Sequence, residues 1–120
     1  MPYDLFMKFI DKMDESQVQE IAKEGPNIVM KLFKILGFSY DLDHVIYSYF
    51  EMAGKYCGWY EFTHQVKHAK YRLVFNANPN LKWTKFLVTY VRSILESLRI
   101  HVEEESVSDG VIVFEFSKRD

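Results

Sequence analysis

The hydrophobic period of the chain changes once, at Trp59, and this change limits the folds that the sequence allows. Before Trp59, apolar residues recur at the spacing of one helix face. After it, in YEFTHQVKHAKYRLVFNA (residues 60–77), apolar and polar residues alternate as they do in β-strands. The sequence therefore predicts an α+β fold in one domain of 120 residues, with a helical part at 1–57 and a sheet-and-helix part at 58–120.

The helical part contains four segments with apolar residues at helical spacing. These segments span residues 3–12, 15–24, 27–36 and 42–56. Asp14 is predicted to cap the second segment, with Gln17 as its partner in a capping box. Gly25 is expected as the C′ residue that closes this segment, with Pro26 opening the next, and Asp41 or Ser39 is expected to cap the fourth. About four N-terminal helices are therefore predicted.

Residues 60–77 predict a hairpin with a defined register. If the turn is centred on His68 and Ala69, the even-numbered residues of the first strand share a face with the odd-numbered residues of the second. That face is apolar except for His64. Loops of two or four residues give the same register. We expect the longer loop, because His-Ala lacks the preference for positive φ that two-residue turns require.

The clearest helix is predicted at residues 81–98, where the apolar side chains form one broad stripe. Asn78 is expected to cap this helix, with Pro79 in its first turn. Trp83 then becomes the first residue of the stripe, at the level where the helix enters the core.

A second hairpin is predicted at residues 100–116. A two-residue Asp-Gly loop would place Phe114 opposite Glu105, whereas a three-residue loop (residues 108–110) keeps the apolar residues on one face. The three-residue loop is therefore expected. The second half of the chain becomes a β-β-α-β-β unit, in which one long helix packs on a four-stranded antiparallel sheet.

His64 is the first candidate for a ligand or interface site. It shares the apolar hairpin face with Tyr60 and Phe62, where it could serve as a ligand or a general base in a pocket. A core histidine bonded to one polar neighbour is the favoured interpretation, because the sequence implies no partner acid.

A second candidate lies at the start of the long helix, where Trp83 is flanked by Lys82 and Lys85. The positive end of a helix with two nearby cations can hold a phosphate or a carboxylate, and Trp83 could stack on a ligand. We favour the simpler interpretation, in which Trp83 belongs to the core.

Patterns typical of enzymes and metal sites are missing. Cys57 is the single cysteine, and no adjacent cation or helix N-terminus is evident to activate it. The four histidines lack metal-ligand spacing, and strand alternation separates Glu104 from Glu103 and Glu105. We therefore expect no catalytic residue, no metal and no cofactor.

Composition limits the partners. With 15 basic and 17 acidic residues the formal charge is −2, which argues against nucleic-acid binding. A weaker option uses the basic residues Lys67, Lys70, Arg72, Lys82 and Lys85. The N-terminus lacks the features of a signal peptide, and no apolar run approaches the roughly 18 residues of a membrane span. A cytoplasmic protein without a membrane segment is expected.

Three stretches resemble an archaeal domain of unknown function that often follows ribbon-helix-helix DNA-binding segments. They are YCGWYEFTHQVKHAKYRLVF, KWTKFLVTYVRSILESL and VSDGVIVFEF. Lys82, Trp83 and Thr84 match the Lys-Trp-Ser part of that family's His-Asp-Leu-Gly-x-Lys-Trp-Ser signature, whereas Ala77 and Asn80 replace its His and Gly. Because no ribbon-helix-helix segment is evident, the resemblance implies a stand-alone accessory domain, which would serve assembly or ligand sensing for a regulator.

Two functions are predicted. The leading one is a non-catalytic interaction domain that forms a homodimer or docks a protein partner through the sheet edge or the apolar helix faces, since 17% of the residues are aromatic. The alternative is a small-ligand sensor with a pocket between the sheet and the N-terminal helices. His64, Tyr60, Phe62 and Trp83 would line that pocket.

Overall fold

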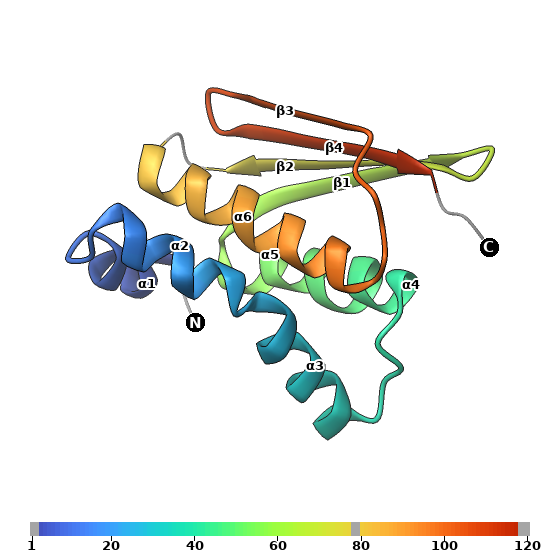
Figure 1. The fold of residues 1–120 in the computed structure, drawn as a ribbon, viewed down its shortest axis with the longest axis horizontal. Helices are drawn as coiled ribbons and strands as arrows, with labels where there is room; N and C mark the ends of the chain where they lie inside the picture. Colours follow the sequence, from blue (N-terminus) through green and yellow to red (C-terminus); the bar gives the residue numbers. More distant parts are fainter. Residues whose placement is uncertain (1–2, 78–79, 118–120) are drawn as a thin grey trace.

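The computed structural model describes residues 3–77 and 80–117 and shows the expected α+β fold. A four-stranded antiparallel sheet forms one layer, and helix α6 (Leu81–Ser97) lies against one of its faces (Figure 1). The first helices pack on the side of α6 that faces away from the sheet (Figure 1). α6 is therefore the central helix of the molecule.

The first three helices follow the predicted segments closely. They are α1 (Tyr3–Ile10), α2 (Glu15–Lys23) and α3 (Gly25–Leu36). Asp14 caps α2 and forms the expected capping box with Gln17. Gly25 directly follows the C-cap Glu24 of α2, as predicted, and it is also the first residue of α3. A Cβ atom at Gly25 would lie 2.8 Å from the ring of Tyr90, so glycine allows α3 to approach α6 closely.

The fourth predicted helix is continuous but changes its hydrogen-bond period. It consists of α4 (Leu42–His44), the π-helix η1 (Val45–Phe50) and α5 (Glu51–Cys57). Asp41 is the cap, and its carboxylate accepts a hydrogen bond from the His44 backbone N–H at 2.9 Å. In the π-helix, the Glu51 N–H donates to the carbonyl of Ile46. This wider turn places Val45, Ile46 and Phe50 in the core.

The first hairpin has the predicted register but a shorter turn. Strands β1 (Tyr60–Lys67) and β2 (Lys70–Ala77) remain paired up to Lys67 and Lys70. The expected four-residue loop is therefore wrong. His68 and Ala69 form a two-residue turn with φ values of 54° and 62°, because this turn fits the twist of paired strands despite the unfavourable residues.

The register predicted for the second hairpin is also wrong. Strands β3 (Glu104–Ser108) and β4 (Val111–Ser117) join through a two-residue Asp-Gly turn that places Glu105 opposite Phe114. All residues of β3 are exposed, so this edge strand has no apolar face to match, and the turn determines the register. β4 also pairs with β2, which gives the strand order β1-β2-β4-β3.

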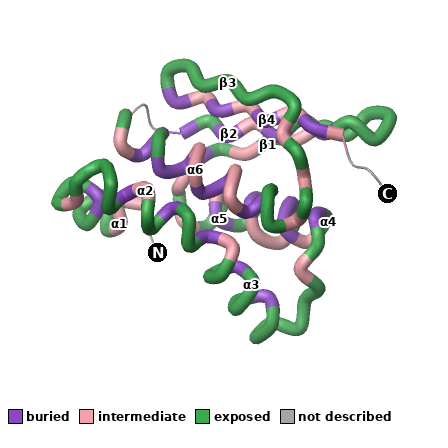
Figure 2. The backbone as a smooth tube through the Cα atoms, viewed as in Figure 1, coloured by how far each residue is buried: buried purple, intermediate pink, exposed green. Residues whose placement is uncertain are grey.

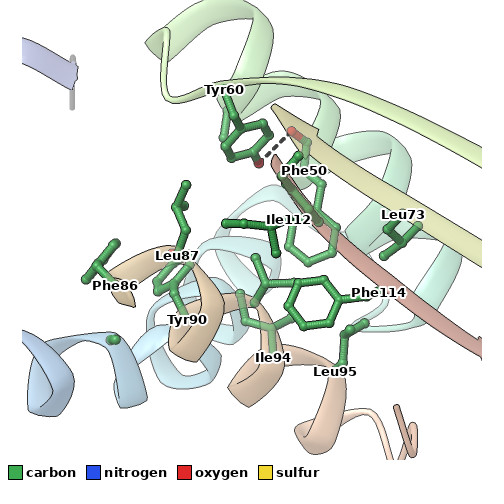
Figure 3. Close-up of a cluster of buried hydrophobic side chains, with 14 of the residues drawn as sticks. Phe50, Tyr60, Leu73, Phe86, Leu87, Tyr90, Ile94, Leu95, Ile112 and Phe114 are labelled. Carbon is green, nitrogen blue, oxygen red and sulfur yellow. Dashed lines mark hydrogen bonds between the residues drawn. The ribbon is translucent and has the colours of Figure 1, made fainter. Parts of the chain in front are cut away.

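The hydrophobic core extends from the sheet across α6 to the first helices, and Figure 3 shows the part between α6 and the sheet. From the sheet come Leu73, Phe75, Ile112, Phe114 and Phe116. The buried residues of α6 are Trp83, Thr84, Phe86, Leu87, Tyr90, Val91, Ile94 and Leu95. Each fully buried large apolar side chain stabilises the fold by about 1.5–3 kcal/mol, so the packing on both sides of α6 contributes to the stability.

Candidate functional site

Trp83 is part of the core and is closed to a ligand. Its side chain is fully buried, and its indole N–H donates to the Trp59 carbonyl at 3.2 Å. The ring stacks on Phe86 and meets the edges of Tyr3 and Phe6. Sequence reasoning therefore favoured the correct interpretation of this residue.

The two lysines beside Trp83 are engaged within the protein. The Lys82 ammonium donates to the backbone carbonyl of Met13 at 3.0 Å, and Lys85 forms an ion pair with Glu15 at 2.7 Å. Both contacts attach the start of α6 to the corner between α1 and α2. The predicted cap Asn78 and the following Pro79 lie outside the described residues. Within the described part, the Asn80 side chain caps α6 by accepting the Trp83 N–H at 3.1 Å.

The candidates on β1 form a row of rings. Tyr60 is buried, and its hydroxyl donates to the Phe50 carbonyl at 2.7 Å (Figure 3). Phe62 stacks on His64, and the His64 ring also forms an edge contact with Tyr47 at a centroid distance of 5.0 Å. Trp83 belongs to a different aromatic group, so the four residues predicted to line one pocket do not surround a common cavity.

The helical side of the molecule contains a groove that sequence reasoning missed. Its volume is about 680 Å³, and α1, α2, α3, η1, α5 and α6 all contribute to it. We call it the helical groove; it is lined by Phe6, Ile21, Ile28, Leu32, Ser48, Tyr49, Met52, Ala53, Tyr56, Cys57, Trp59, Phe86 and Tyr90. This lining contains no Asp, Glu, Lys, Arg or His.

Two tyrosine hydroxyls supply the polar part of the helical groove. Tyr49 on η1 and Tyr90 on α6 share a short hydrogen bond between their hydroxyl groups. Burial raises the pKa of Tyr90 to about 12, although the bond from Tyr49 acts in the opposite direction. Burial also raises the pKa of Tyr49, and the neighbouring Tyr90 adds to this effect. Both hydroxyls therefore remain protonated at neutral pH.

One wall of the helical groove continues into an exposed apolar surface on α3. We call it the α3 stripe; its members are Ile28, Leu32, Ile35 and Leu36, which follow one another on one helix face. Ile35 is 82% exposed. Figure 2 shows that α3 is largely exposed, in contrast to α6. The sequence does contain a signal for this surface: the apolar face of residues 27–36 is wider than the part of it that α6 covers.

Comparisons with protein-family models, with curated proteins and with solved structures find no match to this chain. The resemblance to an archaeal accessory domain therefore stays a prediction. Across residues 3–77 and 80–117, no group of three or more His, Cys, Asp or Glu side chains could hold a metal ion. In that same part of the chain, no helix combines the length and apolarity needed to cross a membrane.

Proposed function

We propose that this protein is a non-catalytic interaction domain that self-associates through the α3 stripe. The observation that carries the proposal is the exposure of four large aliphatic side chains on one face of α3. Contiguous apolar surface of this kind typically marks an interaction site in a water-soluble fold. The resemblance to an accessory domain favours a role beside a transcription regulator in the cytoplasm, and this role remains part of the proposal.

The available area fits a second copy of the chain. The α3 stripe lies across the helical groove from Met52 and Tyr56, which are 45% and 68% exposed. If a fully exposed side chain of this size offers roughly 200 Å², these six residues present roughly 600–700 Å². A stable interface buries about 800 Å² on each partner, so backbone and flanking residues would supply the remainder.

The charges beside this surface are complementary. Helix α3 carries Lys31 and Lys34 and contains no acidic residue. The segment 41–57 carries three acids, Asp41, Asp43 and Glu51, against one basic residue, Lys55, so its formal charge is −2 when histidine is neutral. In a two-fold symmetric pair, the α3 helix of each copy could face the acidic segment of the other.

Light scattering over a range of protein concentrations tests self-association. We expect the wild-type protein to form a dimer and Ile35→Glu to shift the population towards monomer, because it places a charge in the interface. Leu81→Glu is the matched control, since Leu81 is 69% exposed at the start of α6. A wild-type protein that stays monomeric at the highest concentration would contradict the proposal.

Small-ligand sensing is the second candidate function, and the helical groove is the observation that favours it. A volume of about 680 Å³ lies within the roughly 300–1,000 Å³ typical of ligand sites. A ligand that binds only the folded state raises the melting temperature, and the stabilisation grows with the logarithm of 1 + [L]/Kd. Thermal shift measurements with a panel of metabolites would therefore reveal such a ligand.

A further inference from the structure

We propose that the helical groove binds an uncharged, mainly aromatic molecule with one hydrogen-bond acceptor, which the Tyr49–Tyr90 pair recognises. This inference rests on the ligand-sensing candidate and does not require self-association. It goes beyond that candidate because it specifies the chemical class of the ligand and the side chains that select it.

The shape and composition of the lining favour flat rings. Six of the thirteen lining residues are aromatic, namely Phe6, Tyr49, Tyr56, Trp59, Phe86 and Tyr90. Met52 and Cys57 add polarizable sulfur atoms, which also make favourable contacts with aromatic rings. A planar apolar ligand can therefore stack on or meet the edge of several rings at once.

The absence of charge from the described lining selects against ionic ligands. A carboxylate or an ammonium group that enters an apolar site loses its hydration, and no opposite charge in this lining replaces it. The protonated hydroxyls of Tyr49 and Tyr90 add no charge of their own. An uncharged molecule avoids this penalty and keeps the gain from apolar burial.

The tyrosine pair retains one donor for a ligand. Two hydroxyl groups carry two hydrogens, and only one of them lies in the bond between Tyr49 and Tyr90. Among the residues that the structure describes, neither hydroxyl has a second partner. The remaining hydrogen can be donated to a carbonyl or ether oxygen of a bound molecule. A ligand acceptor would therefore satisfy a donor that the protein itself leaves open.

Three naphthalenes of similar size test the inference by calorimetry, with tryptophan fluorescence, to which Trp59 in the groove contributes, as a second measurement. We expect 2-acetylnaphthalene to bind about 5–10-fold more tightly than 2-ethylnaphthalene, because it alone accepts a hydrogen bond. Anionic 2-naphthoate should bind more weakly than either. The double variant Tyr49→Phe/Tyr90→Phe should bind the first two equally, and it should fold, since replacing both partners by isosteric apolar groups is nearly neutral.

A second pair of variants locates the site. Ser48→Trp introduces a large side chain into the groove wall and should abolish binding measured by calorimetry, whereas Ser106→Trp on exposed strand β3 should leave it unchanged. If none of the naphthalenes binds, both the ligand-sensing candidate and this inference are wrong. If all three bind equally, or if the tyrosine variant keeps the preference, ligand sensing stands and the proposed recognition is wrong. Binding that survives Ser48→Trp would place the site elsewhere and overturn the inference.

Discussion

Helices α6 and α3 are both amphipathic, yet the molecule covers the apolar face of only one of them. α6 buries eight of its 17 residues, whereas α3 buries Gly25, Val29 and Phe33 and leaves the α3 stripe exposed. The difference arises from position: α6 lies between the sheet and the first helices, and α3 extends away from this centre (Figure 1). An apolar stripe thus predicts a helix, but it does not say whether the partner of that stripe belongs to the same chain.

A matched pair of truncations sharpens this comparison and has the largest expected effect. Leu87→Ala removes a fully buried side chain from α6 and should lower the free energy of unfolding by about 2–5 kcal/mol. Leu36→Ala removes the same atoms from the α3 stripe, where Leu36 is 54% exposed, and should cost less than about 1 kcal/mol. Urea denaturation at low protein concentration measures both. Equal losses would show that α3 contributes to the core as much as α6 does.

The burial of the Tyr90 hydroxyl on α6 should make stability depend on pH in the alkaline range, because burial raises the pKa of Tyr90 although the bond from Tyr49 lowers it. The pKa of Tyr90 is 10.0 in its ordinary state and about 12 in the folded protein, so the unfolded chain loses this proton first. Stability from this source is complete below pH 10 and falls as the pH rises towards 12, by about 2–3 kcal/mol in total. The free energy of unfolding should be measured for the wild type and for Tyr90→Phe between about pH 9 and 12. The difference between the two pH profiles gives the part of the loss that comes from Tyr90. Parallel pH profiles for the two proteins would contradict it.

The close approach of α3 to α6 at Gly25 should produce a smaller effect. Gly25→Ala places a methyl group 2.8 Å from the ring of Tyr90, so the ring or one of the helices must shift. Overpacking costs about 1–3 kcal/mol, and the better helix propensity of alanine returns about 1 kcal/mol, which leaves a net loss of about 1 kcal/mol. In a Tyr90→Leu background the same change should be neutral or stabilising. A loss of equal size in both backgrounds would mean that the ring contact is not its cause.

The sequence pattern predicted most of the fold, and the errors occur where a local turn or an edge position decides the structure. The register of β1 and β2 follows from alternation, because β2 is buried on one face. β3 has no buried residue, so its alternation carries no information about pairing. There the Asp-Gly turn prevails, and Glu105 forms an ion pair with Arg92 of α6 (Oε1 to Nε, 2.9 Å).

The candidate site was less predictable than the fold. The helical groove combines residues from six elements between Phe6 and Tyr90, and no spacing within one segment reveals such an assembly. The predicted residues Tyr60 and Trp83 carry the aromatic character of a ligand site, but both are buried in the core. Their position follows from how β1 and α6 pack together, which is a tertiary property.

Hydrogen exchange of the backbone amides as a function of protein concentration tests the central claim most directly, because it reports on α3 and α6 in the same experiment. We expect the amides of α3 from Ile28 to Leu36 to become more protected as the concentration rises, since a second copy covers the α3 stripe. The amides of α6 from Leu87 to Leu95 should show the same strong protection throughout. Exchange in α3 that is fast and identical at every concentration would contradict the assignment of this helix as the association surface.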